Sequence, residues 1–192
     1  METSASLLER LKTAPEDSDW SQLVELYTPL IRTWMRRYSS SQQDADDVVQ
    51  EVLSVVVRKL PSFERARLGS FRSWLRSITV NCLRDSWRSQ KFRPSAKGGH
   101  DFDSILNQLA DPQSELSQLW NAEHDQHVLQ SLLNQIRSST PDETWNVFKR
   151  VSIDDESPTN VASEFGITVN SVYIAKSRVM TRLRKIGRGL IE

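Results

Sequence analysis

Apolar residues recur at three- and four-residue steps along most of this 192-residue chain, and no segment shows the strict alternation of a half-buried strand. The stretch Trp20–Tyr38 is typical, because Tyr27, Ile31 and Trp34 fall on one side of a helix. Pro29 lies inside this stretch and is expected to kink or divide the helix. The spacing predicts an all-α protein.

Polar and proline residues place the next boundaries. Asp44 is expected to cap a second helix that runs to about Leu60 and stops at Pro61. Ser62–Ser70 reads as a loop, and a long helix is expected over residues 71–92.

A change in composition divides the chain. Residues 93–113 are rich in proline, glycine, acidic and polar residues, and we expect a linker there with at most a short helix around Ile105–Leu109. Only 38% of the residues are apolar, which favours two modest cores over one large core. The expected organisation is a helical module over residues 1–92, a linker over 93–113 and a second helical module over 114–192.

The second module has its own boundary signals. Helical spacing returns over residues 114–137, and Thr140–Glu143 has the pattern of a capping box with proline at the first helical position. A helix opening there would direct Trp145, Phe148 and Val151 inward.

Residues 158–175 have the spacing of a helix-turn-helix. Ala162 is small where two helices would cross, Gly166 suits the tight turn, and Thr168 can cap the second helix. The shared core would consist of Val161, Phe165, Ile167, Val172 and Ala175.

The outward face of the second of these helices is polar near its start and basic towards its end. This is the order expected when a helix N-terminus enters the major groove of DNA, and it favours DNA binding over a hairpin used only for packing. The outward residues are Asn170, Ile174, Ser177, Arg178, Thr181, Arg184, Lys185 and Arg188, with Tyr173 and Arg182 at the flanks.

Charge is sorted along the chain although its net value is zero. Residues 58–97 hold 11 basic and 2 acidic residues, and residues 172–189 hold six basic residues and no acidic one. Residues 98–143 between them hold eight acidic residues and one basic residue. This pattern favours two surfaces for a polyanion over ordinary solvated helix faces, and the acidic linker around Asp101–Asp111 could shield the basic faces in the free protein.

The expected helix over residues 71–92 has an apolar side and a basic side. Trp74, Ile78 and Cys82 lie on the apolar side, and Trp87 lies among the cations of the other. An indole among guanidinium groups suits the stacking of an unpaired base, whereas packing of Trp87 against another helix is equally compatible with the periodicity. The cations are Arg72, Arg76, Arg84, Arg88 and Lys91.

The helix that follows Asp44 carries a polar stripe that includes Asp47, Gln50 and Glu51. The residue pattern alone favours an ordinary solvated face, with a docking surface as the alternative.

Signatures of catalysis are missing from the sequence. His124 and His127 lack further well-spaced ligands, so we expect exposed polar positions and no metal or other cofactor. The longest uncharged run has 11 residues, too short to span a membrane, and no signal peptide is evident. Together with the single cysteine, these features indicate a cytoplasmic protein that is not an enzyme.

Three motifs, in this order, resemble the extracytoplasmic-function sigma factors of bacterial RNA polymerase. They are residues 44–52, residues 62–88 and residues 161–184. The resemblance implies a promoter-specificity subunit whose partners are promoter DNA and core polymerase, through the clamp helices of its largest subunit and its flap, with an anti-sigma protein left open. The alternative is a helix-turn-helix regulator that acts without docking on polymerase.

The resemblance also implies roles for individual residues. Polymerase binding falls to Asp46, Asp47, Gln50 and Glu51. Contacts to the −10 promoter element fall to Phe63, Arg72, Arg76, Asn81, Arg84, Trp87, Arg88 and Lys91. Contacts to the −35 element fall to Thr168, Asn170, Ser171, Tyr173, Ile174, Ser177, Arg178, Arg182 and Arg184.

Overall fold

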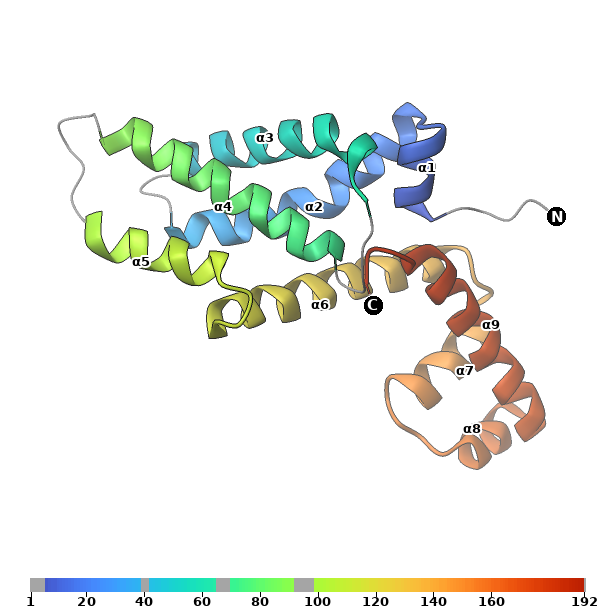
Figure 1. Cartoon of the computed structure of the whole chain (residues 1–192). Helices are drawn as coiled ribbons and strands as arrows, with labels where there is room; N and C mark the ends of the chain where they lie inside the picture. Colours follow the sequence, from blue (N-terminus) through green and yellow to red (C-terminus); the bar gives the residue numbers. More distant parts are fainter. Residues whose placement is uncertain (1–5, 39–41, 65–69, 92–98, 192) are drawn as a thin grey trace. The chain divides into compact units, whose positions relative to one another are not determined.

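The computed structural model describes residues 6–38, 42–64, 70–91 and 99–191 (Figure 1). Within these ranges the chain forms nine α-helices and one 3₁₀ turn and no strand, so the all-α prediction is confirmed. The elements are α1 (Leu7–Thr13), α2 (Asp17–Tyr38), α3 (Gln42–Lys59), η1 (Leu60–Ser62), α4 (Ser70–Lys91), α5 (Gly99–Ala110), α6 (Glu115–Ser138), α7 (Asp142–Ser152), α8 (Pro158–Phe165) and α9 (Val169–Gly187).

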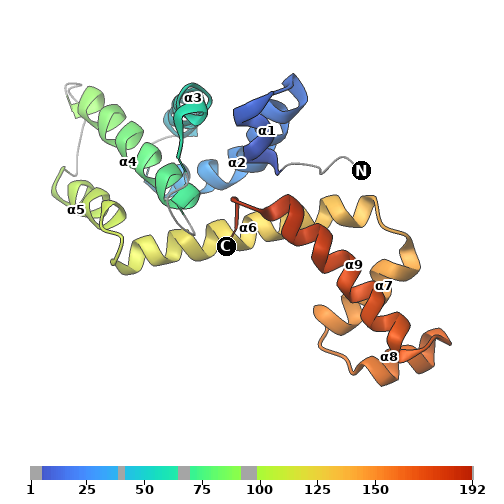
Figure 2. The same cartoon turned by 45° about the vertical axis from the view of Figure 1, so that its right-hand side comes forward.

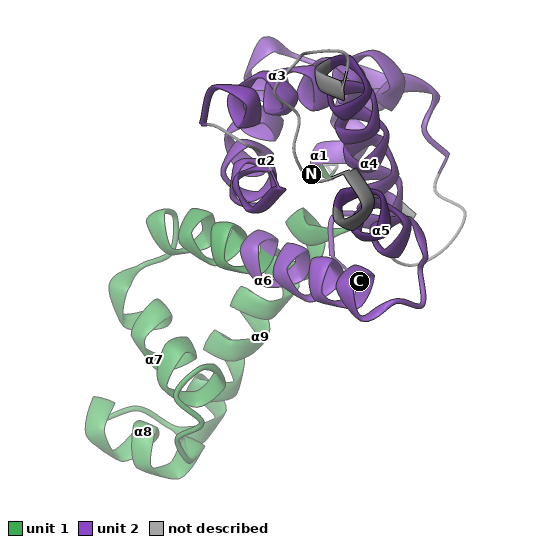
Figure 3. Ribbon diagram, turned by 90° about the vertical axis from the view of Figure 1, so that its left-hand side faces the viewer, with its two compact units in different colours: residues 1–6, 129–188 green, residues 7–128, 189–192 purple. Residues whose placement is uncertain are grey.

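The chain divides into two compact units (Figure 3). The larger unit comprises Leu7–Val128 and Gly189–Glu192, and the smaller unit comprises Leu129–Arg188 and Met1–Ser6. None of the helices that the structure describes is long and apolar enough to cross a membrane.

Helices α2, α3 and α4 supply most of the core of the larger unit. Ile31 and Trp34 of α2 and Val52 of α3 are fully buried. Helix α2 continues through Pro29 and is not divided there. Helix α3 begins at Gln42, so Asp44 lies within its first turn and not at the cap expected from the sequence, where its charge still favours the helix dipole.

Helix α5 is longer than the short helix expected within the linker. Its apolar stripe, Phe102, Leu106 and Leu109, is buried, and the helix packs on α4. Figures 1 and 2 both show α4 between α3 and α5. The first half of α6 also belongs to the larger unit, so the division falls after Val128 and not within residues 93–113. Residues 93–98 of the expected linker lie outside the described residues.

Helix α7 of the smaller unit begins close to the position that the sequence indicated, but the predicted capping residue does not cap it. Helix α7 starts at Asp142, and Pro141 at its N-cap makes no side-chain hydrogen bond. Thr140 instead donates its hydroxyl to the carbonyl of Ile136 at 2.6 Å and accepts a hydrogen bond from Arg182. The capping box is therefore not formed, because the hydroxyl completes the end of α6.

Helices α7, α8 and α9 enclose the core that the sequence predicted for the helix-turn-helix. Val161, Ala162, Val172 and Ala175 are buried with Val147 and Val151, and Phe165 and Ile167 pack against them. Arg150 of α7 forms ion pairs with Glu156 and with Glu164 of α8.

The turn between α8 and α9 has the predicted local chemistry. Gly166 adopts φ 63°, where a side chain would be strained, and the amide of Ile167 donates to the carbonyl of Ala162 at 3.0 Å. The hydroxyl of Thr168 accepts from the amide of Ser171 at 3.1 Å, which confirms the cap of α9.

His124 lies in the core of the larger unit, in contrast to the exposed position expected from the sequence. Its side chain is fully buried, its Nε2 lies 3.4 Å from the hydroxyl of Tyr27, and its Nδ1 lies 3.0 Å from Asp125. Burial lowers the pKa of His124, and the bond to Asp125 opposes this effect without reversing it.

We expect the larger unit to lose stability as the pH falls below the ordinary histidine pKa of 6.5. The unfolded chain then binds a proton that the folded core disfavours, at a cost of at most about 1.4 kcal/mol per pH unit. Urea denaturation at pH 7.5 and 5.5 measures this loss. His124→Gln should reduce the pH dependence and His127→Gln should retain it, and equal slopes in all three proteins would contradict the assignment.

Candidate functional site

The exposed face of α3 presents three of the four residues predicted to bind polymerase. Asp47, Gln50 and Glu51 are exposed. Asp46 is half-buried and accepts a hydrogen bond from Arg32 Nε at 2.7 Å, which links α3 to α2. Asp46 therefore links two helices, whereas Asp47 accepts a hydrogen bond at 3.3 Å from Gln43 of its own helix and is exposed, as are Gln50 and Glu51.

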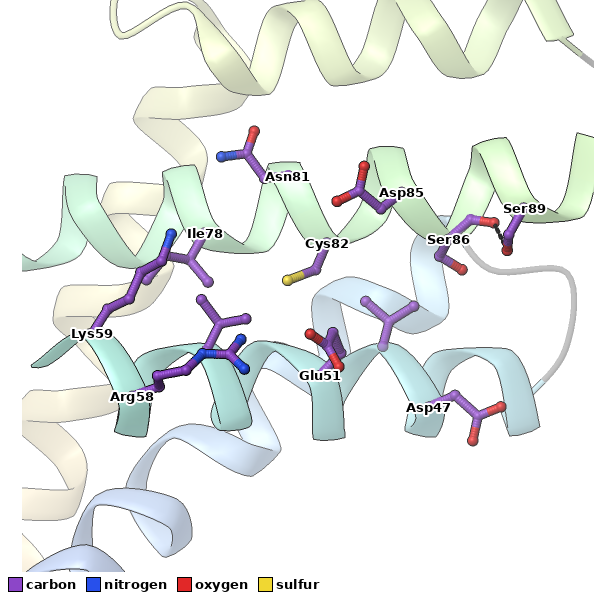
Figure 4. Close-up of a pocket in the computed structure, with 12 residues that line it drawn as sticks. Asp47, Glu51, Arg58, Lys59, Ile78, Asn81, Cys82, Asp85, Ser86 and Ser89 are labelled. Atoms are coloured by element: carbon purple, nitrogen blue, oxygen red, sulfur yellow. Dashed lines mark hydrogen bonds between the residues drawn. The ribbon is translucent and has the colours of Figure 1, made fainter.

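A groove of about 500 Å³ lies between α3 and α4, beside these acidic residues (Figure 4). Asp47 and Glu51 line it from α3, and Asn81 and Asp85 line it from α4. Its floor includes Cys82, whose thiol pKa burial raises to about 11, so the thiol stays protonated. The sequence did not place Asp85 beside the acidic stripe, because only the packing of α4 on α3 brings the two helices together.

The opposite face of α4 is covered by α5. The ring of Trp87 lies 4.5 Å from the ring of Phe102, centroid to centroid, and its buried indole Nε1 has no hydrogen-bond partner among the described residues. Trp87 packs against another helix, the second of the two alternatives that the periodicity allowed. Phe102 therefore occupies part of the indole surface, and the side chain of Trp87 is half-buried.

The arginines beside Trp87 are also engaged within the larger unit. Arg76 is 4% exposed and donates to the carbonyl of Ser117 and to the side chain of Asn121 of α6. Burial lowers the pKa of its guanidinium. Arg72 forms an ion pair with Asp125, and Arg84 donates to Asn107 at 3.4 Å.

The remaining predicted −10 residues divide between core and surface. Phe63 is buried against Phe71 and Trp74, where three aromatic rings close the end of the core, and its contact to the −10 element stays a prediction. Asn81 is exposed, and Arg88 is exposed with a loose ion pair to Asp85. The side chain of Lys91 and residues 65–69 of the predicted loop lie outside the described residues.

The outward face of α9 is largely open, as the sequence predicted. Its exposed members among the predicted −35 residues are Thr168, Asn170, Tyr173, Ile174, Ser177, Arg178, Arg182 and Arg184. Ser171 is half-buried beside the cap. Arg182 donates to the carbonyl and the hydroxyl of Ser139 and to Thr140, so it holds the end of α6.

A second groove, of about 430 Å³, lies between α9 and the start of α7. Thr144 of α7 and Ser177, Arg178 and Thr181 of α9 line it. Hydroxyls and guanidinium groups are among its lining side chains, together with the apolar Pro141 and Val179, and most of the lining surface is apolar. The sequence gives no signal for Thr144, because helical spacing marks the apolar side of α7 and not the element that faces its polar side.

The two histidines of α6 serve the fold. His127 Nε2 lies 2.6 Å from the carbonyl of Leu26, and His124 is buried as described above. Among the described residues, no group of three or more histidine, cysteine, aspartate or glutamate side chains could hold a metal ion.

Comparison with known proteins identifies the region that contains α2, α3 and α4. The family described as sigma-70 region 2 matches residues 23–93. SigF of Caulobacter vibrioides, an ECF RNA polymerase sigma factor, is 32% identical over 79 residues, which cover 41% of this chain and 43% of that protein. SigE of Mycolicibacterium smegmatis, also an ECF RNA polymerase sigma factor, is 32% identical over 69 residues, which cover 36% of this chain and 26% of that protein.

A third relative is matched over a longer stretch. The RNA polymerase sigma factor NccH of Alcaligenes xylosoxydans is 27% identical over 100 residues, which cover 51% of this chain and 53% of that protein. The chain thus spans about half or less of the length of each of these relatives.

Proposed function

We infer that this chain is an extracytoplasmic-function sigma factor that directs core RNA polymerase to specific promoters. The observation that carries the proposal is the presence of both parts in one chain: a region 2 with an open acidic helix, and a helix-turn-helix with an open basic helix. Promoter recognition of this kind needs binding and strand separation and no group of its own for covalent catalysis.

Docking on polymerase is assigned to the exposed stripe of α3. Asp47 and Glu51 are one turn apart on the same face, and Gln50 lies beside them. Carboxylates at solvent-exposed positions suit a partner surface of basic residues. Asp46 contributes indirectly, because its ion pair with Arg32 fixes α3 on α2.

Recognition of the −10 element is assigned to α4. Unpaired bases gain stacking and polar contacts that duplex DNA cannot offer, and this offsets the cost of unpairing. Asn81 and Arg88 are open to the strand in the free protein. Trp87, Arg72 and Arg84 are half-buried and contact Phe102, Asp125 and Asn107, so withdrawal of α5 and the first half of α6 would open them further to the strand.

Recognition of the −35 element is assigned to α9. Its exposed polar residues lie at the start of the helix, where base edges would be met, and its cations follow where phosphates would lie. A helix-turn-helix regulator that binds DNA without polymerase has the same α9. The difference between the two functions therefore lies in α3.

Transcription with purified core polymerase on a promoter library tests the proposal. Initiation at a defined set of promoters, dependent on this chain, is the expected result. An absence of initiation together with binding to symmetric duplex sites would favour the regulator.

Glu51→Arg should weaken binding to core polymerase by about tenfold or more, because it reverses a charge in the middle of the docking stripe. The fold should be retained, since the side chain is exposed. Glu25→Arg is the matched control, because Glu25 is an exposed carboxylate on α2 of the same unit. Fluorescence anisotropy of the labelled chain against core polymerase measures both, and equal affinities would refute the docking assignment.

A further inference from the structure

The first two turns of α9 expose large apolar side chains. Tyr173 is 54% exposed, Ile174 is 43% exposed and Val169 is 37% exposed. The buried core of the smaller unit uses the opposite face of the helix, through Val172 and Ala175. Apolar side chains on the open face are thus surplus to the packing of the unit and are available to a ligand.

These side chains surround the centre of the open face. At 100° per residue, the direction opposite Val172, Ala175 and Val179 passes close to Asn170. Tyr173 and Ile174 lie about 50° to either side of this direction. Asn170 and Ile174 are also one turn apart, so an amide and two apolar groups would meet the same short segment of a ligand.

The charge around this patch identifies the ligand as DNA. Residues 172–189 contain six basic residues and no acidic one, which matches the phosphates on both sides of a major groove. The first of these cations is Lys176, so no cation lies among the first seven residues of α9. Arginine and lysine are the usual readers of guanine, whereas apolar side chains contact the methyl group of thymine and asparagine reads adenine.

We propose that Ile174 and Tyr173 contact thymine 5-methyl groups and that Asn170 pairs with an adjacent adenine, so that α9 selects a −35 element containing A·T pairs. This inference rests on the proposed function, and it names the class of sequence that the helix-turn-helix reads. A protein partner on the same patch is the competing reading, and the experiment below separates the two.

The full chain is used to select duplexes from a randomised pool, and the selected duplex is then prepared with each thymine in turn replaced by uracil. Uracil pairs as thymine does but lacks the 5-methyl group. At one or two positions the replacement should weaken binding about fourfold, the value expected for one buried methyl. Ile174→Ala should bind the thymine duplex with a similar loss and should no longer distinguish uracil from thymine at one of these positions.

Ile153→Ala is the matched control, because Ile153 is an isoleucine of the same unit, 50% exposed, at the C-cap of α7 and outside the open face of α9. It should bind thymine and uracil duplexes as the unaltered chain does.

Selection of a G·C-rich element, no sequence preference, or an equal uracil effect in Ile174→Ala would overturn the inference. Loss of polymerase binding in Ile174→Ala with unchanged DNA binding would also overturn it, in favour of a protein partner. A failure of the proposed function is distinguishable, because it would abolish initiation with polymerase and leave selection by the free chain intact.

Discussion

Phe102→Ala combined with Asp125→Asn is expected to raise the affinity of the free chain for a single-stranded promoter oligonucleotide by up to about 100-fold. Phe102 is buried against Trp87, and Asp125 forms an ion pair with Arg72. Truncating a buried phenylalanine weakens packing by about 3–5 kcal/mol, here at the contact that holds α5 on α4. The binding-competent form then becomes more populated, and the apparent affinity rises with its population.

A control variant should change the net charge and leave the contacts of α5 and α6 with α4 intact. Asp103→Asn also removes one negative charge, but at an exposed position on α5. It should therefore change the affinity less than about twofold. Anisotropy with a labelled oligonucleotide measures all variants. An equal gain in Asp103→Asn would show that net charge, and not the release of Trp87 and Arg72, controls binding.

Hydrogen exchange provides a test that needs no substitution. When the oligonucleotide binds the unaltered chain, amides of residues 102–110 should lose protection, because α5 leaves α4. If α4 becomes protected in the complex and the protection of α5 is unchanged, then α5 does not leave α4 when the oligonucleotide binds, and this prediction is wrong.

Phe148→Ala is expected to unfold the smaller unit in a large fraction of molecules. Phe148 is 2% exposed and joins α7 to Ile136 of α6 and Val179 of α9. The substitution costs about 3–5 kcal/mol, which approaches the whole stability of a small unit. Hydrogen exchange should show a loss of protection in α9, and duplex binding should fall with it.

Ile153→Ala serves as the control for this prediction, because its side chain is half exposed at the end of the same helix. It should leave the exchange of α9 unchanged. Binding to core polymerase through α3 should survive Phe148→Ala. Retained hydrogen-exchange protection of α9 in the same variant would refute the role given to Phe148 in this core.

The sequence located most helices and the whole helix-turn-helix, because the interactions that define them are local. Gly166 and the cap at Thr168 act on neighbouring residues, and the apolar spacing of α9 identified both its buried and its open face. The acidic stripe of α3 was visible for the same reason, since residues one turn apart share a face whatever packs behind them.

Local pattern was insufficient wherever a polar side chain had a distant partner. Thr140 had the sequence of a capping residue, yet its hydroxyl bonds to Ile136 and Arg182. His124 had the neighbours of an exposed residue, yet it is buried against Tyr27, 97 positions away. Periodicity gives the direction of a side chain and not the element that it meets.

The amino-acid sequence by itself determined that this protein is helical, that α8 and α9 form a helix-turn-helix, and that its cations gather on α4 and α9. Only the tertiary structure decided which of those cations are open. Arg76 and Trp87 of α4 are covered by residues of α5 and α6, whereas Arg178 of α9 remains exposed. The physical reason is that burial depends on contacts between segments far apart in the chain, whose free energy no single helical pattern contains.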